Sequence, residues 1–395
     1  MNYSEAVEEL TSRHSNRKDP AKDSTKETLN LLNNPEQDYD IILVGGTNGK
    51  GSVVEMVSEL LQDQGYSTGT YKSPHLTTCR ERIQLNSEKI PEKDFLYLYN
   101  WINDLETELS FFEFMTSMAY LYFSEKNVDY AIMEVGMGGR LDATNVVDPE
   151  ISAITNLGKD HSKYLGETRK ERAVEIAGIV GSGPVVLGDM SEELIEAAED
   201  KNARIKGKKV LDGNANTKLD FENHEFRIPV RGGFQKDNCG MALSIVEELD
   251  EIPEDLTTAF EDLECPGRME VKGKKPLYIH DGAHNLSAVR KIMDDLPDGF
   301  TCVFNASKNK DVEEMVSILE EKASKFYFTE SNVEWASRDA EELAQQTSKE
   351  YEIERDPVEA ARKARKDTNR KGCVLATGSL YLIGSLREKS QKKED

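Results

Sequence analysis

The sequence contains no apolar run long enough to cross a membrane, and its first residues, MNYSEAVEEL, show no basic segment followed by an apolar one. We therefore expect a soluble protein that carries no targeting segment, has no membrane partner and works in the cytoplasm. Cysteine is scarce as well, because only five cysteines are scattered over 395 positions, without paired spacing. This scarcity favours reduced thiols over disulfides or a zinc site.

Positive charge is also in short supply. The chain has 50 lysines and arginines against 74 aspartates and glutamates, so its net charge is −24 and its pI is near 4.8. A surface of this sign repels the phosphates of nucleic acid, which disfavours nucleic acid as the main partner. The acidic residues are spread along the chain instead of forming a tail, as expected of a protein in a salt-rich cytoplasm.

The chain is too long for one ordinary core, and two domains are expected. Strand-like and helix-like segments alternate, which predicts an α/β fold with a mostly parallel sheet. We place an N-terminal domain of the phosphate-loop type at residues 1–270 and a smaller Rossmann-like α/β domain at residues 271–395. Polar loops follow several predicted strands, and ligands of such sheets bind at the carboxyl ends of the strands.

One glycine-rich stretch, LVGGTNGKGSVVEMV, joins a strand-like segment to a helix-like one. It does not match the strict phosphate-loop pattern, because Val44 stands where the first glycine belongs and Gly51 where serine or threonine belongs. Successive backbone N–H groups at a helix N-terminus nevertheless bind phosphate whatever the exact sequence of the loop. Lys50 supplies a cation, and the hydroxyls of Thr47 and Ser52 can reach phosphate oxygens or a metal. The alternative is an ordinary glycine-rich turn.

Further stretches follow GGTNGKGSV in a fixed order. They are YKSPHL, RERIQLN, FFEFMTSMAYLYF, EVGMGGRLDATNVV, ITNLGKDHSKYLGET, PGRMEV, DGAHN and ATGSLYLIG. Together they resemble the motifs of the folylpolyglutamate synthase/dihydrofolate synthase family, in the Mur ligase superfamily, over nearly the whole chain. The resemblance implies a monomeric enzyme that uses ATP and magnesium.

The resemblance also implies a nucleotide site that draws on both domains. Its cofactor-binding residues are Thr47, Asn48, Gly49, Lys50, Gly51, Ser52, Asn238, Arg268 and Asp281. Among the candidate residues, Lys50, His161 and Arg268 are expected to be catalytic. A guanidinium at the domain junction can reach triphosphate oxygens from the side of the second domain.

By the same resemblance, Ser73 and Glu134 hold a first magnesium ion and His161 a second one. Ser73 and Glu134 each end a predicted strand, so both can lie at one sheet edge, and oxygen ligands suit magnesium. One departure concerns the second ion, because the family has a carbamylated lysine where this chain has Ile176. Either the second ion is held more weakly or a nearby acid replaces the lysine. The candidate acids are Glu175, Glu171 and Asp160.

The segment FFEFMTSMAYLYF is rich in aromatic residues, most of which must pack in the core. Its first turn resembles the segment that contacts the pterin-bearing substrate in the family. The candidate substrate-binding residues are Ser110, Phe111, Phe112 and Glu113. Aromatic rings suit a flat heterocycle, which agrees with this expectation.

The resemblance therefore implies an ATP-dependent ligase that adds L-glutamate to the carboxylate of a folate or of dihydropteroate, through an acyl phosphate. Two alternatives stay open. One is a Mur-type ligase that joins an amino acid to a different carboxylic acid. The other is a non-catalytic nucleotide-binding relative, for which Ile176 is the only support. The sequence does not distinguish synthesis of dihydrofolate from extension of a polyglutamate tail.

Overall fold

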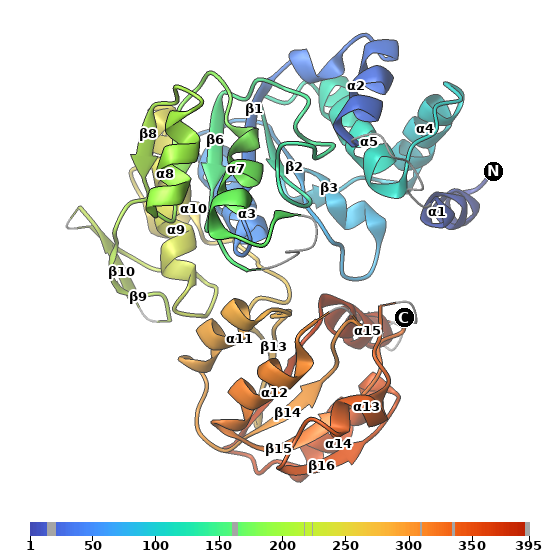
Figure 1. Ribbon diagram of the computed structural model, residues 1–395, viewed down its shortest axis with the longest axis vertical. Coiled ribbons are helices and arrows are strands. Elements are labelled where there is room, and N and C mark those ends of the chain that lie inside the picture. Colours follow the sequence, from blue (N-terminus) through green and yellow to red (C-terminus); the bar gives the residue numbers. More distant parts are fainter. Residues whose placement is uncertain are drawn as a thin grey trace. The chain divides into compact units, whose positions relative to one another are not determined.

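The computed structural model describes residues 1–13, 21–159, 165–216, 218–222, 224–308, 310–333 and 336–391 (Figure 1). The chain folds into two compact units. Unit 1 comprises Met1–Asp212, Asp220–Arg227 and Asp237–Leu263, and unit 2 comprises Gly213–Leu219, Ile228–Lys236 and Glu264–Asp395. Both units contain strands and helices, so the predicted α/β class is confirmed. The single domain boundary after residue 270 stays a prediction.

Unit 1 is built on an eight-stranded sheet with the order β4-β3-β2-β5-β1-β6-β7-β8. Its strands are β1 (Asp40–Gly45), β2 (Thr68–Tyr71), β3 (Ile83–Leu85), β4 (Glu88–Lys89), β5 (Tyr130–Glu134), β6 (Ile151–Ile154), β7 (Val185–Leu187) and β8 (Ile205–Gly207). From β2 to β8 the neighbouring strands are parallel, while β3 and β4 form an antiparallel edge. The sequence pattern predicted the central strands β2, β5, β1 and β6 but not the β3–β4 hairpin.

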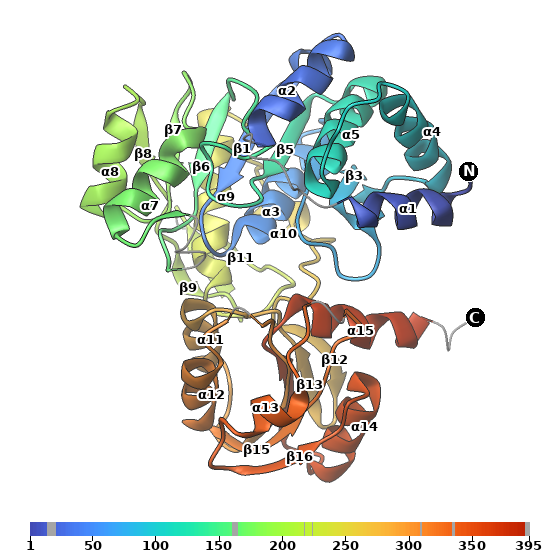
Figure 2. The same cartoon turned by 45° about the vertical axis from the view of Figure 1, so that its right-hand side comes forward.

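Helices cover both faces of this sheet. They are α1 (Tyr3–Ser12), α2 (Ala21–Leu31), α3 (Lys50–Asp63), α4 (Glu92–Asn103), α5 (Phe111–Lys126), α7 (Arg169–Ile176), α8 (Glu192–Glu199), α9 (Gln235–Glu248) and α10 (Leu256–Ala259). Helix α3 packs against β1, β2 and β5 and against α10. Helices α1, α4 and α5 pack against one another, and α5 also packs against α2 and β2 (Figure 2).

The central strands bring several predicted site residues to one edge of the sheet. Strands β1, β5 and β6 run parallel and in register, so Gly45, Glu134 and Ile154 end at the same edge. Strand β1 is buried on both faces, which is typical of a parallel sheet covered by helices. Ile41 and Leu43 pack in the core cluster that includes α5 and α7, whereas Ile42 and Val44, which alternate with them, face the other side.

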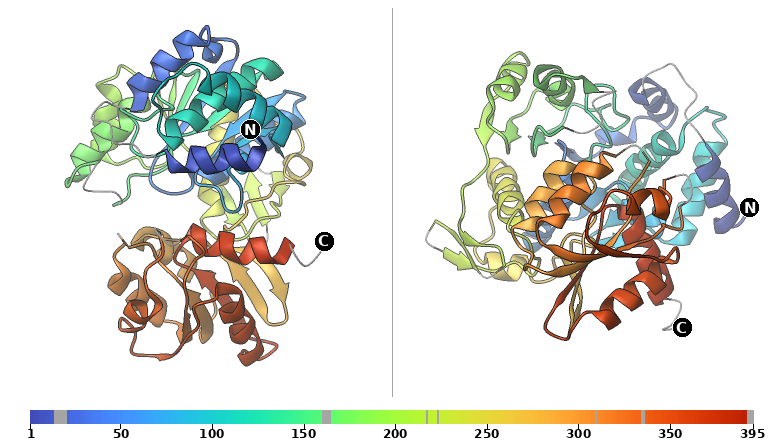
Figure 3. Two further views of the ribbon diagram at one scale, coloured as in Figure 1. Left: turned by 90° about the vertical axis from the view of Figure 1, so that its right-hand side faces the viewer. Right: turned by 60° about the horizontal axis from the view of Figure 1, so that its bottom comes forward.

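Unit 2 is built on a six-stranded sheet with the order β12-β13-β17-β14-β15-β16, parallel except for β12. Its strands are β12 (Glu270–Lys274), β13 (Leu277–His280), β14 (Phe300–Phe304), β15 (Ala323–Phe328), β16 (Glu350–Ile353) and β17 (Cys373–Thr377). Its helices are α11 (Leu286–Met293), α12 (Val312–Glu320), α13 (Ala340–Ala344), α14 (Pro357–Asp367) and α15 (Leu380–Gln391). Helices α11 and α12 pack side by side (Figure 3).

The short strands predicted between residues 205 and 230 are present. Apart from β8 they are β9 (Asp212–Asn214), β10 (Lys218–Phe221) and β11 (His224–Phe226), which form a small sheet of their own. In the described part of the chain, none of the helices is both long and apolar enough to cross a membrane. All five cysteines are buried and none is joined in a disulfide.

Candidate functional site

The glycine-rich loop between β1 and α3 contains two backbone conformations that suit glycine. Gly46 has φ +117° and Gly49, which caps the N-terminus of α3, has φ +89°. A Cβ atom on Gly46 would lie 2.3 Å from Thr155 Oγ1, and one on Gly49 would lie 2.5 Å from Asn238 Oδ1. Glycine is therefore needed at both positions, for its backbone freedom and for its lack of a side chain.

The first turn of α3 has the features of an anion site. The N–H groups of a first turn have no acceptor within their helix, and the helix dipole adds partial positive charge there. Lys50 lies in this turn, where its Nζ donates to Gly46 O at 3.0 Å and lies 3.9 Å from Glu134 Oε1. The hydroxyl of Ser52 is buried and has no hydrogen-bond partner among the described residues. Such a buried polar group fits a site that a ligand completes.

Glu134 lies beside this loop at the end of β5. The residue is 5% exposed, and its Oε2 accepts a hydrogen bond from Ser73 N at 3.0 Å. The same oxygen lies 3.4 Å from the position that a Cβ atom on Gly51 would take. The structure thus brings Glu134 and Ser73 next to the glycine-rich loop, as we predicted from the positions of these two residues at strand ends. A carboxylate and hydroxyl oxygens are the donors that magnesium prefers, so this group fits one such ion.

The predicted second magnesium position falls largely outside the described residues, where both His161 and Asp160 lie. Ile176, which by the resemblance stands in place of the family's lysine, ends α7 and is 2% exposed. It packs in the apolar core cluster of unit 1. The side chain therefore contributes to packing and offers no ligand atom.

Two of the three acids that could replace the missing lysine have other partners. Glu175 Oε2 forms an ion pair with Arg140 Nε at 2.9 Å. Glu171 accepts from Thr168 N at 3.0 Å in the capping box that starts α7. Both carboxylates thus have partners within unit 1, and the third candidate, Asp160, lies outside the described residues.

The candidate substrate residues differ in their surroundings. Ser110 and Glu113 form the capping box of α5, because Ser110 N donates to Glu113 Oε2 at 2.6 Å and Glu113 N donates to Ser110 Oγ at 3.4 Å. These two side chains therefore fix the start of the helix. The ring of Phe112 lies against Gly136, since a Cβ atom there would be 2.4 Å from Phe112 Cζ. Phe112 thereby joins α5 to the loop that follows Glu134.

Phe111 belongs to a cluster that the sequence did not predict. The guanidinium carbon of Arg82 lies 4.9 Å from the centre of the Phe111 ring, and Arg82 Nε donates to His75 Nδ1 at 2.9 Å. Burial and, to a smaller extent, the charge of Arg82 lower the pKa of His75 to about 4, so this ring is neutral at pH 7. The motif RERIQLN marked the segment without singling out Arg82, which is only 8% exposed.

A second feature that the sequence did not predict is a set of hydrogen bonds between the glycine-rich loop and the residues that follow β6. Thr155 Oγ1 and Asn156 Nδ2 each donate to Asn48 O at 2.7 Å, and Asn156 Oδ1 accepts from Asn48 N at 3.1 Å. Thr47 N donates to Asn156 O at 3.1 Å, and Gly158 N donates to Thr47 Oγ1 at 2.8 Å. The stretch ITNLG belongs to the motifs that carry the resemblance. Its polar residues did not indicate these hydrogen bonds, however, because polar residues after a strand are typical of any loop.

Arg268 and Asp281 are close to each other in unit 2. A Cβ atom on Gly282 would lie 3.1 Å from an Arg268 guanidinium nitrogen. Asp281 is 2% exposed and accepts from Met269 N and Ala283 N, each at 2.8 Å. Burial raises the pKa of Asp281, and the Arg268 charge and these hydrogen bonds oppose that rise. The part of both residues in nucleotide binding stays a prediction.

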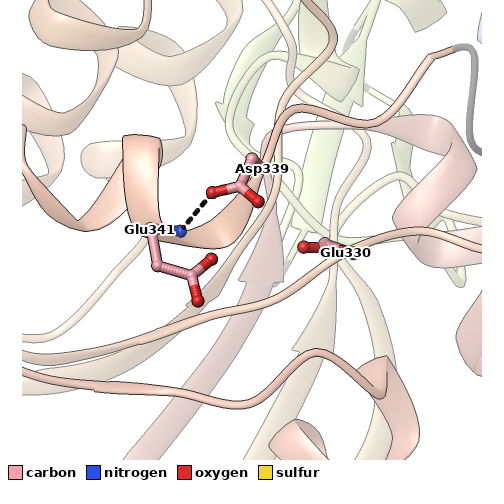
Figure 4. Close-up of side chains that lie close together, drawn as sticks. All are labelled: Glu330, Asp339 and Glu341. Carbon is pink, nitrogen blue, oxygen red and sulfur yellow. Dashed lines mark hydrogen bonds between the residues drawn. The ribbon is translucent and has the colours of Figure 1, made fainter.

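Unit 2 contains one further group of acids, namely Glu330, Asp339 and Glu341 (Figure 4). One carboxylate oxygen from each lies within 4.8 Å of the others. Arg355 forms ion pairs with all three, at 3.3 Å to Asp339 and 2.5 Å to Glu341, and Glu341 N donates to Asp339 Oδ1. Because one guanidinium already serves the whole group, we interpret it as an ion-pair network on the surface.

Family models match most of the chain. The model of the Mur ligase middle domain matches residues 44–246, and that of the Mur ligase glutamate ligase domain matches residues 267–380. These ranges include the glycine-rich loop in the first match and Arg268 and Asp281 in the second.

Individual relatives agree with the family models. The dihydrofolate synthase/folylpolyglutamate synthase of Bacillus subtilis is 31% identical over 92% of this chain and 93% of its own length. A probable bifunctional folylpolyglutamate synthase/dihydropteroate synthase of Haloferax volcanii is 32% identical over 98% of this chain, which spans only 50% of that relative. The crystal structure of a Yersinia pestis folylpolyglutamate synthase/dihydrofolate synthase, complexed with AMPPNP and Mn, has a TM-score of 0.89 at 25% identity and covers 99% of this chain and 98% of its own.

Proposed function

Since the chain belongs to the folylpolyglutamate synthase/dihydrofolate synthase family of ATP-dependent glutamate ligases, we propose that it joins L-glutamate to the carboxylate of dihydropteroate or of a folate. One observation carries this proposal. The cation of Lys50, the buried hydroxyl of Ser52 and the carboxylate of Glu134 lie together at the edge of the sheet where the glycine-rich loop enters α3. This combination suits a nucleoside triphosphate with a divalent ion.

The reaction proceeds in two steps. A carboxylate oxygen of the acid attacks the γ-phosphorus of ATP, the bond to the bridging oxygen breaks, and ADP leaves with an acyl phosphate formed. The amine of glutamate then attacks the acyl carbon, phosphate leaves, and the nitrogen loses a proton as the amide forms. Neither step needs a nucleophile from the protein, so the residues act by positioning and by neutralising charge.

The loop residues supply that charge and position. The N–H groups of the first turn of α3 point along the helix axis toward a bound anion, and Lys50 brings a full positive charge to the same place. Glu134, Ser73 and Ser52 would hold magnesium, which supplies further charge neutralisation on the phosphates. We also propose that Arg268, Asp281 and Asn238 face the nucleotide, and that Phe111 and Phe112 face the pterin of the acid.

One assay tests the function against its rivals. Phosphate release from ATP is measured with glutamate and with dihydropteroate, with tetrahydrofolate, or with neither acid. Release that requires glutamate and occurs with dihydropteroate, with tetrahydrofolate or with each of them supports the proposal and identifies whether the enzyme has one of the two activities or both. Glutamate-dependent release only with a different carboxylic acid would indicate another Mur-type ligase. Nucleotide binding without release under any condition would indicate a non-catalytic relative.

The missing lysine leads to a prediction about magnesium. If an acid replaces it, we expect Asp160→Asn to weaken the magnesium dependence of turnover more than Glu175→Gln does, because Glu175 is already paired with Arg140. Asp160 is next to His161 in the sequence, and in a loop two adjacent side chains can reach one ion. The measurement is a magnesium titration of turnover for both variants and the parent.

The control for this titration is Glu196→Gln, which removes an exposed carboxylate on α8 whose partner is Lys170, at 3.2 Å. It should leave both the stability and the magnesium midpoint close to those of the parent. Curves that match the parent for both Asp160→Asn and Glu175→Gln would show that the idea of a compensating acid is wrong.

A further inference from the structure

The peptide between Asn48 and Gly49 is held from one side by two residues after β6, Thr155 and Asn156, which we call the loop clamp. The carbonyl oxygen of Asn48 accepts two hydrogen bonds of 2.7 Å from these side chains, and its N–H donates to Asn156 Oδ1 at 3.1 Å. Asn156 thus pairs with the backbone of Asn48 through both ends of its amide. Thr155 is 8% exposed, so its hydrogen bond is shielded from water.

Because a peptide bond is planar, the contacts of the Asn48 carbonyl also fix the direction of the Gly49 N–H. In a planar trans peptide the C=O of one residue and the N–H of the next point in opposite directions. Because the Asn48 carbonyl points at the loop clamp, the Gly49 N–H points away from it. Gly49 has φ +89° and, as a glycine, tolerates either sign of φ. Nothing intrinsic to Gly49 therefore prevents the peptide from flipping, and a flipped peptide would present a carbonyl oxygen where the N–H had been.

The backbone that follows β6 also sets the hydroxyl of Thr47, through Gly158 and not through the loop clamp. Its Oγ1 accepts a hydrogen bond from Gly158 N at 2.8 Å, while Thr47 N donates to Asn156 O at 3.1 Å. A hydroxyl that accepts from the backbone keeps its own proton available for donation. The same segment after β6 thus fixes two donors of the loop, one from the backbone and one from a side chain.

We infer that Thr155 and Asn156 are positioning residues for the nucleotide phosphates, which they serve by keeping the Gly49 N–H directed at the anion. This inference rests on the proposed function, because it needs a triphosphate in the loop. This role requires no contact between either residue and the phosphates. Loss of the clamp lets the Asn48–Gly49 peptide flip, so that only a fraction of the molecules is ready to bind, and the apparent affinity falls by that fraction.

The test compares Thr155→Val, Thr155→Ser and Asn156→Ala with the parent. Thr155→Val keeps the shape of the side chain and removes the donor to Asn48, whereas Thr155→Ser keeps the hydroxyl. We expect the dissociation constant of AMPPNP, measured by calorimetry, to rise about five- to tenfold in Thr155→Val and in Asn156→Ala, as for the loss of a buried hydrogen bond. It should stay within about twofold of the parent in Thr155→Ser. The KM for ATP should rise in step, while the KM for glutamate stays unchanged.

Ser152→Ala is the matched control. Ser152 lies on β6 itself, is buried, and donates to Ile179 O at 2.9 Å, an acceptor that is not part of the Asn48–Gly49 peptide. The variant should lose stability in urea unfolding and bind AMPPNP like the parent. Parent-like AMPPNP binding by folded Thr155→Val and Asn156→Ala would overturn the inference and leave the proposed function standing. Equal weakening in Ser152→Ala would also overturn it, because the effect would then be one of general stability. A parent that does not bind AMPPNP would overturn both.

Discussion

Lys50→Ala should lower kcat by on the order of 10²-fold or more at saturating ATP, because the transition state loses a cation at the place where phosphoryl charge develops. The structure also predicts a cost in stability. Lys50 has a side chain only 14% exposed, donates to Gly46 O and lies 3.9 Å from the buried carboxylate of Glu134. Removing it takes away this ion pair and the hydrogen bond to Gly46 O, so we expect a loss of about 1–3 kcal/mol in the free energy of unfolding.

The measurements are turnover and urea unfolding, with Lys322→Ala as the matched control. Lys322 lies in unit 2 and also donates to backbone carbonyls, at 2.7 Å to Met293 O and 3.0 Å to Leu296 O. Lys322→Ala should lower stability and keep parent-like turnover. Turnover within a few-fold of the parent for Lys50→Ala would contradict the assignment of the phosphate loop.

Salt should raise the stability of the whole chain. With a net charge of −24, the surplus carboxylates repel one another, and this repulsion is weaker in the unfolded chain. Because the Debye length falls from about 10 Å at 0.1 M salt to about 3 Å at 1 M, most of this repulsion is screened at molar KCl. We expect the melting temperature to rise by at least several degrees over this range, which corresponds to about 2 kcal/mol or more. Turnover should rise with it.

A charge variant separates screening from other effects of salt. Replacing four exposed glutamates with lysine changes the charge by +2 at each position, so the net charge changes from −24 to −16. The four positions are Glu8, Glu125, Glu254 and Glu261. Each is exposed, so the changes should disturb little packing. The variant should melt higher than the parent in low salt and gain less from KCl. A parent melting temperature that is flat or falls with KCl would show that the surplus charge is not destabilising.

The parts of the site that follow from periodicity were predictable from the sequence. Alternating segments placed Ser73 and Glu134 at strand ends, and parallel strands must bring those ends to one edge. The order of the central strands, by contrast, depends on which strands pair, and no local pattern encodes that pairing. The β3–β4 hairpin was missed for a related reason, since two or three residues per strand give too little alternation to recognise.

Side-chain partners were harder to predict than positions. Ser110 and Glu113 have the spacing of a capping box, and they form one, yet the same letters also resembled a substrate segment. The loop clamp joins residues more than a hundred positions apart, so only the folded chain shows that Asn156 reaches Asn48. The loop sequence does not indicate that the Lys50 side chain is only 14% exposed. Its burial arises from neighbours that the fold supplies.

The division of the chain between the two units affects how the protein folds during synthesis and which fragments proteolysis can produce. The chain leaves unit 1 after Asp212 and returns to it twice, and unit 1 is complete only at Leu263. Asn238, which lies against Gly49, belongs to the last of these returns. A ribosome therefore has to synthesise the first segments of unit 2 before the glycine-rich loop acquires its neighbour. No single proteolytic cut yields two intact halves, so trimming experiments that seek an autonomous nucleotide-binding fragment should recover partly folded pieces instead.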